Sequence, residues 1–247
     1  MINIVIPMAG RGSRFANEGY VLPKPMIDVH GKPMIQRVVN NLTPKCPHRF
    51  IFICQEQHVV EYNLEPLLYS IAPGSEIVTT NGITEGAACS VMLTEHLIDN
   101  SDPLMIANSD QWVDVDIDDY LRVMGDQNLD GLIMTMKADD PKWSFVGFDS
   151  EGKVNNVVEK QVISDEATVG IYNFKNGSEF CMAVKKMIVN DLRVNGEFYV
   201  APTYNILIEN NAKIGIYNVG EEMNGMYGLG IPSDLKLFLS HPISNKL

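Results

Sequence analysis

Short apolar runs alternate with amphipathic segments along roughly the first 140 residues of the chain. Five runs are rich in β-branched and aliphatic side chains, as buried strands are, and they cover Ile2–Ile6, Arg49–Cys54, Glu76–Thr80, Pro103–Ala107 and Leu132–Lys137. Between them, Pro33 followed by apolar positions at helical spacing predicts a helix to Leu42, and a second helix is predicted over Gly86–Ile98. Strands that alternate with helices predict βαβ units in a mostly parallel sheet, which binds ligands beyond the carboxyl ends of its strands.

The second half of the chain has a different pattern. Three closely spaced runs are typical of strands, at Ser144–Phe148, Lys153–Glu159 and Thr168–Phe174. The turn sequence Asp149–Gly152 joins the first two as a predicted hairpin. Helices are predicted at about 177–190 and 199–210 and again after Pro232. These patterns predict one α/β domain over residues 1–247, with a Rossmann-like, mostly parallel mixed sheet flanked by helices and an inserted β-rich lobe.

Composition excludes several classes of partner. The 247 residues include 45% hydrophobic and 20% charged side chains, and the formal net charge is −12. A nucleic-acid surface needs clustered Lys and Arg, so this charge argues against nucleic acid but not against a single nucleotide. No run reaches the ~20 apolar residues of a membrane span and Ile2–Ile6 lacks a basic leader, so we expect no membrane partner and a cytoplasmic location. The cysteines have no C-x-x-C spacing and are expected to be reduced thiols: Cys46, Cys54, Cys89 and Cys181.

The loop after the first run carries the most specific chemistry. It reads Pro7-Met8-Ala9-Gly10-Arg11-Gly12-Ser13-Arg14-Phe15 and is followed by Leu22-Pro23-Lys24-Pro25-Met26. Its glycines let the backbone approach a phosphate, Arg11 and Arg14 can grip phosphate oxygens, and Lys24 adds a point charge on a stiff segment. The loop is neither a Walker A loop nor a complete G-x-G-x-x-G fingerprint, and a G-x-G alone is compatible with a plain surface loop.

An opening strand followed by A-G-x-G-[ST]-R-[FL] and then K-P-M resembles the signature of the sugar-nucleotidyltransferase family, whose members make NDP-sugars and whose relatives make CDP- and CMP-activated compounds. The resemblance extends along nearly the whole chain. It implies an enzyme that moves an NMP from CTP, dTTP or UTP to a phosphorylated small molecule, such as a sugar 1-phosphate, and releases pyrophosphate. It also implies Mg²⁺ as cofactor, with a nucleotide-binding half over about 1–140 and an acceptor-binding half over about 141–247.

The resemblance assigns nucleotide-binding roles to several segments. In the family the glycine-rich loop wraps the triphosphate, so Arg14 would stabilise its charge, and Lys24 matches the lysine at the reacting α-phosphate. Thr84-Glu85-Gly86-Ala87 matches the segment that contacts the base, although Gly86 can equally start a helix. The residues implied to bind the nucleotide are Met8, Ala9, Gly10, Arg11, Gly12, Ser13, Arg14, Lys24, Thr84, Glu85, Gly86, Ala87, Asn108 and Ser109.

Other matches concern the metal and the acceptor. Asp110 follows the fourth run and is similar to the family's Mg²⁺ aspartate, although an Asp after a strand is often a turn residue. Lys160 resembles the lysine of the family's E-K pair, which contacts the acceptor phosphate. Gly170 is implied to leave room for the acceptor and Glu197 to hydrogen-bond to it. The implied catalytic residues are Arg14, Lys24, Asp110 and Lys160, and the implied acceptor contacts are Lys160, Gly170 and Glu197.

The late part of the chain departs from the family's pattern. Where many members carry a second metal aspartate in W-L-D-T-G-T, the aligned position here is Gly228. Either Asp110 and the phosphates alone hold Mg²⁺, or another acid such as Asp234 contributes, and Asp234 can equally be a cap of the last helix. Pro141–Phe145 and Glu159–Ser164 resemble segments of capsule-locus cytidylyltransferases, which implies a role in making precursors of surface polysaccharides.

Two other classes of function fit parts of the sequence. A nucleotide-sugar-dependent glycosyltransferase would need a D-x-D metal motif, and Asp114-Val115-Asp116 has that spacing but leads into a helix start at Ile117. A non-catalytic nucleotide-binding module would bind NTP and release no pyrophosphate. The sequence leaves open which NTP and acceptor are used and whether the chain forms a homo-oligomer.

Overall fold

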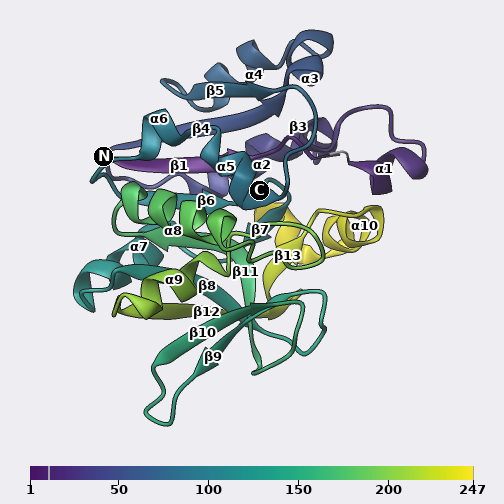
Figure 1. The fold of residues 1–247 in the computed structure, drawn as a ribbon. Helices are drawn as coiled ribbons and strands as arrows, with labels where there is room; N and C mark the ends of the chain where they lie inside the picture. The colour runs from purple at the N-terminus through teal and green to yellow at the C-terminus, as the bar shows by residue number, and fades with distance from the viewer. Residues whose placement is uncertain (11, 247) are drawn as a thin grey trace.

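The computed structural model describes residues 1–10 and 12–246. Within this part of the chain, eleven strands form one mixed sheet, in the order β5-β4-β1-β6-β11-β8-β12-β13-β7, with the hairpin β9-β10 attached to β11 (Figure 1). The strands are β1 (Ile2–Pro7), β4 (His48–Gln55), β5 (Glu76–Thr80), β6 (Leu104–Ala107), β7 (Gln111–Val113), β8 (Gly131–Lys137), β9 (Ser144–Phe148), β10 (Val154–Glu159), β11 (Glu166–Phe174), β12 (Ile214–Glu222) and β13 (Gly225–Gly228). A separate small ribbon joins β2 (Asp28–Val29) to β3 (Lys32–Pro33).

Strand direction changes at β11. On one side, β1 pairs in parallel with β4 and β6, and β4 pairs in parallel with β5. β11 then runs antiparallel to both β6 and β8, which in turn pairs in parallel with β12. The sheet is therefore the mixed α/β sheet that the sequence pattern predicts. The carboxyl ends of β1, β4 and β6 meet at one edge, on the right in Figure 1, where the first and last helices also lie.

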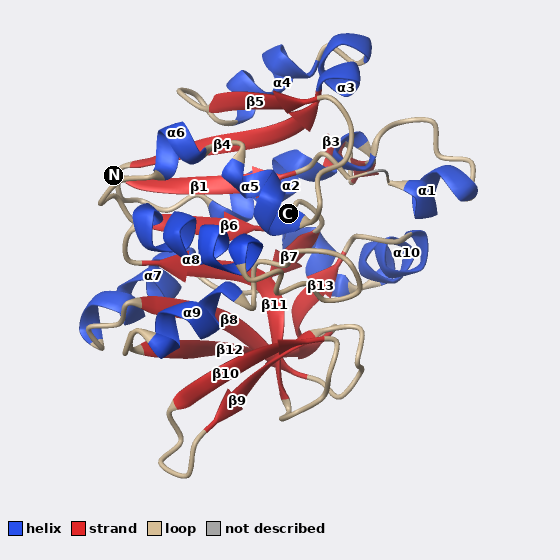
Figure 2. Cartoon of the chain, in the orientation of Figure 1, coloured by secondary structure: helices blue, strands red, loops and turns tan. Residues whose placement is uncertain are grey.

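Helices cover both faces of the sheet because side chains alternate along its strands (Figure 2). In β1, Ile4 and Ile6 face one apolar cluster with α2, α4 and α7, while Val5 faces another with α5, α6, α8 and α9. The helices are α1 (Ser13–Asn17), α2 (Met34–Leu42), α3 (Glu56–Glu61), α4 (Leu64–Ile71), α5 (Ala87–Met92), α6 (Glu95–Ile98), α7 (Ile117–Asp126), α8 (Gly177–Val189), α9 (Thr203–Glu209) and α10 (Pro232–Ser240), with 3₁₀ turns η1 (Lys24–Met26) and η2 (Pro242–Lys246). None of these helices is long and apolar enough to cross a membrane, in so far as the chain is described.

A third apolar cluster joins the two ends of the chain. Phe15 of α1 is buried in it together with Trp112 of β7 and Phe238 of α10. The Trp112 ring lies 5.6 Å from the Tyr227 ring and 6.1 Å from the Phe238 ring, measured between centroids. This packing fixes the opening loop beside the last helix and so sets one wall of the site described below.

Most predicted elements are confirmed, and two predicted helices need correction. The helix expected over Gly86–Ile98 is two short helices, because the buried Thr94 side chain donates to the Val91 carbonyl (2.7 Å) and the chain turns there. The helix expected at about 199–210 begins only at Thr203, preceded by a proline that has no N–H to donate. Strands β7, β12 and β13 and helices α3 and α4 are additional to the predicted elements.

Candidate functional site

The opening loop leaves the sheet at the carboxyl end of β1. The Met8 N–H continues the pairing with β4 through a 2.9 Å hydrogen bond to Ile53. The Gln55 side-chain amide donates to the Ala9 carbonyl at 2.7 Å, which ties the loop to the sheet edge. The predicted loop residues that the structure describes are Met8, Ala9, Gly10, Gly12, Ser13 and Arg14. Arg11, also predicted to bind the triphosphate, lies outside the described residues.

Lys24 and Asp110 meet although 86 positions separate them in the sequence. The Lys24 Nζ lies 2.8 Å from the Asp110 Oδ2, and both side chains are only about a quarter exposed, at 23% and 24%. Lys24 starts the 3₁₀ turn η1, held between two prolines, and Asp110 follows the carboxyl end of β6. The sequence therefore predicted two charged groups that the fold brings into direct contact.

A charged pocket opens beside this ion pair. Arg14 and Asp110 line it from the first half of the chain, and Lys142 and Asp234 line it from the second half. The complete lining is Arg14, Asn108, Asp110, Gln111, Lys142, Trp143, Met226, Gly228, Gly230, Ile231 and Asp234. Burial raises the pKa of the Asp234 carboxyl, and the positive charges of Lys142 and Arg14 partly offset this rise. The pocket thus combines cations and carboxylates at the carboxyl edge of the sheet.

An adjoining aromatic pocket shares Asn108, Lys142 and Trp143 with the charged pocket. Its other lining residues are Pro7, Ala87, Ile106, Ser144, Glu159, Thr168, Gly170, Tyr172, Tyr199, Val200 and Ala201. Glu159 is 8% exposed and accepts a hydrogen bond from the Ser144 hydroxyl. Burial raises the pKa of the Glu159 carboxyl above its usual value, and the Ser144 hydrogen bond only partly opposes this. A buried carboxylate at a pocket wall favours a ligand that offers N–H or O–H donors.

Lys160 reaches the aromatic pocket only through Tyr199. Its backbone φ is 56°, so the chain turns after Glu159 and the two neighbouring side chains diverge. The Lys160 Nζ donates to the Tyr199 hydroxyl at 2.6 Å, and this hydrogen bond raises the lysine's pKa. Glu197, the other predicted acceptor contact, is exposed and adds negative charge near the same tyrosine. Glu159, rather than Lys160, is the member of the pair that lines the pocket.

The segment predicted to contact the base is packed against a distant loop. Gly86 is the residue before α5, and a Cβ added to it would overlap the Phe198 carbonyl. The Phe198 N–H donates to the Glu85 carbonyl at 2.8 Å, and the Ala88 N–H donates to the Phe198 carbonyl at 3.0 Å. Thr84 is held by a 2.6 Å hydrogen bond to the Ser90 hydroxyl. Close backbone packing therefore accounts for this glycine, while the neighbouring Ala87 lines the aromatic pocket.

Gly170 makes room for a side chain of the protein itself. Its φ is 82°, and a Cβ at this position would overlap the Asn108 amide. The Asn108 N–H donates to the Gly170 carbonyl at 3.0 Å, so this contact fixes the residue shared by the two pockets. Ser109 is 3% exposed and lines neither pocket. Gly170 thus acts on the site through Asn108.

Several lining residues were not among the predicted site residues, and Lys142, Gln111 and Glu159 are the ones that bear on the chemistry of the site. Lys142 lines both pockets and its Nζ lies 3.0 Å from a Glu222 carboxylate oxygen. Gln111 is 6% exposed, and its side-chain nitrogen has no hydrogen-bond partner within the described residues. Glu159 was noted only as the neighbour of Lys160. The P-K-W-S-F sequence that contains Lys142 was noted as a resemblance to related enzymes. It did not identify Lys142 as a site residue, because a lysine next to a strand is usually solvated.

The donor set of the charged pocket suits Mg²⁺. No group of three or more His, Cys, Asp or Glu side chains that could cage a metal occurs in residues 1–10 and 12–246. Mg²⁺ is commonly held by one or two carboxylates together with substrate phosphates rather than by an all-protein cage. Asp110 offers an oxygen ligand in the pocket that Arg14 also lines, and Gln111 of the same lining has a side-chain nitrogen without a hydrogen-bond partner among the described residues. The residues present therefore fit a metal ion that is bound jointly with a phosphate.

A protein-family model described as nucleotidyl transferase matches residues 4–192. The chain belongs to the nucleotidyl transferase family. Among solved structures, this nucleotidyl transferase is similar to the nucleoside-diphosphate-sugar pyrophosphorylase of Vibrio cholerae RC9, with a TM-score of 0.79 and 25% sequence identity, over 96% of this chain and 100% of the other. The resemblance to nucleotidyltransferases, the enzyme class that it implies and the predicted fold class are thereby confirmed.

Two curated relatives match over a large part of this chain. The bifunctional protein GlmU of Methanococcus maripaludis is 23% identical over 248 residues, which is 97% of this chain and 54% of that protein. The mannose-1-phosphate guanylyltransferase catalytic subunit beta of Danio rerio is 25% identical over 181 residues, which is 69% of this chain and 49% of that protein. The chain spans about half the length of these relatives.

Proposed function

We propose that this nucleotidyl transferase moves a nucleoside monophosphate from CTP, dTTP or UTP to a phosphorylated small molecule, a sugar 1-phosphate or a similar acceptor, and releases pyrophosphate. The observation that carries the proposal is the 2.8 Å contact between Lys24 and Asp110, since Asp110 lines a pocket together with Arg14. A cation and an oxygen ligand at one sheet edge are what a bound triphosphate needs. The adjoining aromatic pocket is close enough to hold the acceptor, because both pockets share three lining residues.

In the proposed reaction the acceptor phosphate attacks the α-phosphorus in line and pyrophosphate leaves. A phosphate monoester is already ionised near neutral pH, so the protein needs no general base. Arg14 and Lys24 would stabilise the charge that develops on the phosphates, and Lys142 is placed between the two pockets to contact the group in transfer. Mg²⁺ held by Asp110 would neutralise further phosphate charge. Catalysis then consists of positioning and charge stabilisation.

The proposed acceptor is rich in hydrogen-bond donors. The buried Glu159 carboxylate and the paired hydroxyls of Thr168 and Tyr172, 2.9 Å apart, lie along one pocket. The names of similar proteins point to sugar phosphates, since one is a nucleoside-diphosphate-sugar pyrophosphorylase and another a mannose-1-phosphate guanylyltransferase catalytic subunit. Together with the capsule-type segments of the sequence, this supports a role in making precursors of surface polysaccharides in the cytoplasm.

A matrix of NTPs against acceptors tests the proposal. Purified protein with Mg²⁺ is incubated with ATP, GTP, CTP, UTP or dTTP and with a panel of sugar 1-phosphates and other phosphomonoesters, and pyrophosphate is measured. We expect release with at least one pyrimidine NTP, dependent on the acceptor, with a nucleotide-linked product seen by mass spectrometry. Cleavage of a supplied nucleotide-sugar without pyrophosphate would favour a glycosyltransferase. NTP binding without pyrophosphate from any acceptor would favour a binding module.

A further inference from the structure

Two glycines, Gly228 at the end of strand β13 and Gly230 just after it, leave space for two carboxylates. A Cβ added to Gly230 would overlap the Asp110 Oδ2, and a Cβ added to Gly228 would lie 3.3 Å from the Asp234 Oδ2. Asp110 follows β6, whereas Asp234 lies in the first turn of α10. The two acids therefore approach the same bare stretch of backbone from different elements, and both line the charged pocket.

Asp234 is held in this position by the packing of its own helix. Its neighbours Leu235 and Phe238 are 2% and 0% exposed and lie in the third apolar cluster with Phe15 and Trp112. This packing therefore fixes the helix backbone that carries the half-buried Asp234 side chain beside the pocket. Its charged neighbours are Arg14, Lys142 and Glu222, and among residues 1–10 and 12–246 its side chain accepts one hydrogen bond, from the hydroxyl of Ser233 at 3.3 Å.

A capping role does not account for Asp234. The residue that precedes α10 is Ile231, and the helix has no side-chain cap hydrogen bond. Asp234 accepts no backbone N–H of the helix among the hydrogen bonds of the described residues. Its negative charge can still favour the helix N-terminus, an effect worth about 0.3–1 kcal/mol. That weak effect would hold equally for an acid pointing to solvent and does not require one that lines the charged pocket with Asp110.

A separate observation indicates that the pocket takes an anion together with the metal. Gln111 is 94% buried and lines the pocket, and its side-chain nitrogen has no partner within the described residues. A buried donor without a partner costs free energy unless a ligand supplies an acceptor. Arg14 lies on the same pocket wall. Two carboxylates, a cation and an unpaired donor together match a magnesium ion that is bound to phosphate oxygens.

We propose that Asp234 is the second protein ligand of the Mg²⁺–NTP complex, supplied by helix α10 in place of a carboxylate on strand β13. The proposal rests on the proposed function, because it concerns the metal of that reaction. It changes the source of the ligand from residue 228 to residue 234. The fold accommodates this change of ligand because Gly228 has no side chain, and the Asp234 carboxylate lies next to the space that a side chain at position 228 would enter.

Metal binding without turnover tests this assignment. The affinity of Mn²⁺ with CTP, UTP or dTTP is measured for the full chain by water proton relaxation enhancement, with no acceptor present. Asp234→Asn should weaken the affinity at least about tenfold, as expected for loss of a metal-site group. Asp119→Asn is the matched control, since Asp119 is an exposed acid in the first turn of α7 and, within the described part of the chain, pairs only with Arg122. The control should bind Mn²⁺ and NTP as the wild type does.

A transplanted carboxylate separates metal binding from helix packing. In the double variant Gly228→Asp, Asp234→Ala the acid returns to the strand, at a position whose backbone does not require glycine. We expect this variant to recover most of the Mn²⁺ affinity that Asp234→Ala loses. Unchanged affinity in Asp234→Asn, or failure of the double variant to recover any, would overturn the assignment of Asp234. Absence of Mn²⁺ and NTP binding by the wild type would instead overturn the proposed function.

Discussion

Lys24 is the residue whose role is most open to a direct test. It makes a short ion pair with Asp110, which lines the charged pocket, and both partners are three-quarters buried. Lys24→Ala should lower the rate of pyrophosphate release at least about a hundredfold, because a preorganised cation aimed at developing charge contributes on that scale. Steady-state kinetics measures the loss, with circular dichroism to establish that the variant is folded.

Lys32→Ala is the control for this change, since Lys32 is an exposed lysine of the same opening region. It should retain the wild-type rate. A folded Lys24→Ala protein with wild-type turnover would contradict the proposed function, whatever the control does.

The buried Glu159 carboxyl makes stability depend on pH in a defined direction. Burial raises its pKa above the ordinary value of 4.5, so the folded state holds the proton more tightly than the unfolded state does. The wild type should therefore lose stability as pH rises from about 4.5 through the raised pKa, while Glu159→Gln should not lose this contribution. The melting temperature of the variant, relative to the wild type, should rise across that window and then level off.

Glu151→Gln is the matched control, because Glu151 lies in the turn of the same hairpin with 69% of its side chain exposed. Its melting temperature should follow the wild type at every pH. A constant difference between Glu159→Gln and the wild type from pH 4 to pH 8 would show that Glu159 does not titrate as its burial requires.

At this scale the sequence predicted pairs of residues better than it predicted their orientation. Lys24 and Asp110 were singled out by motifs in separate segments, and the fold brings them together. Glu159 and Lys160 were noted as a pair, and the structure places Glu159 rather than Lys160 on the wall of the aromatic pocket. The reason is the left-handed backbone at Lys160, with φ 56°, which strand alternation does not foresee. Gln111 could not have been found, because its significance lies in a missing hydrogen-bond partner.

Helix α10 connects the stability of the fold to the geometry of the site. Phe238 is fully buried against Trp112 and Tyr227, whereas Leu237 on the same helix is 53% exposed. Phe238→Ala should lower the free energy of unfolding by about 3–5 kcal/mol, through lost burial and the cavity left behind. Leu237→Ala should change it by no more than about 0.5 kcal/mol. Chemical denaturation of the two variants measures both values.

The same pair of variants reports on the site. Because α10 carries Asp234, loosening its packing should raise the Mg²⁺ concentration needed for half-maximal pyrophosphate release. Leu237→Ala should leave this concentration unchanged. Equal Mg²⁺ requirements in the two variants would mean that α10 does not hold part of the metal site.

Elements were predictable where local pattern and tertiary packing agree. The runs at Glu76–Thr80 and Ser144–Phe148 were predicted with the bounds that the structure has, since each is a β-branched or aromatic run that turn residues delimit. Strand β12, Ile214–Glu222, was not predicted, although its first four residues are mostly apolar. Two glycines and a polar second half weaken the apolar pattern of this segment. Its pairing with β8 joins residues far apart in the sequence, so it depends on tertiary contacts that a local pattern does not contain. The wall that β13 adds to the site was therefore not predicted, whereas the helix after Pro232 that carries Asp234 was.

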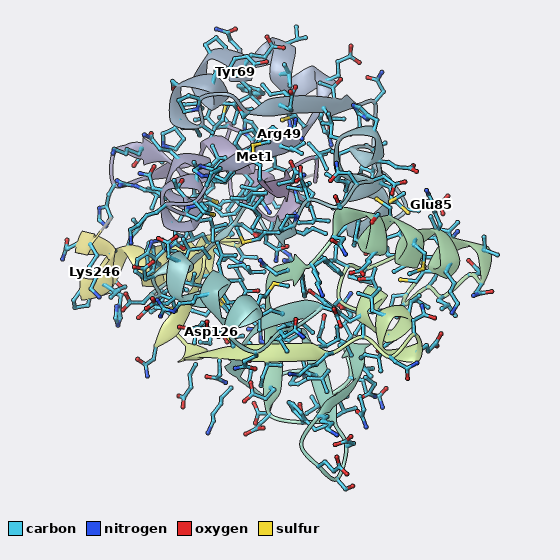
Figure 3. All side chains as sticks on the ribbon, turned by 90° about the vertical axis from the view of Figure 1, so that its left-hand side faces the viewer. Met1, Arg49, Tyr69, Glu85, Asp126 and Lys246 are labelled. Carbon is cyan, nitrogen blue, oxygen red and sulfur yellow. The ribbon has the colours of Figure 1, made fainter. Side chains whose placement is uncertain are left out.

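On the scale of the whole molecule, one sheet passes through both halves of the chain. β6 from the first half and β8 pair on either side of β11 from the second half, so no boundary near residue 140 divides the hydrogen-bonded ladder. The same arrangement places the opening loop next to α10 on the right of Figure 1. A more apolar pocket lies at the other edge, around Met1, which faces the viewer in Figure 3, and it contains none of the predicted site residues. A sheet that is continuous across both halves is what the single domain predicted over residues 1–247 requires.

This continuity predicts that the two halves unfold together, and two buried thiols report on it. Cys54 belongs to the core cluster on one face and Cys181 to the cluster on the other, and burial raises the pKa of each to about 12. Both should resist alkylation at pH 7.5 in the native protein, because the thiolate is the reactive form, whereas the exposed Cys46 should react at once. Pulsed alkylation along a urea gradient, read by peptide mass spectrometry, should show Cys54 and Cys181 becoming reactive at the same urea concentration. A sheet that shares strand β11 between the two halves should lose the helices on both of its faces in one unfolding transition. Well-separated urea midpoints for Cys54 and Cys181 would therefore mean that the halves are independent domains.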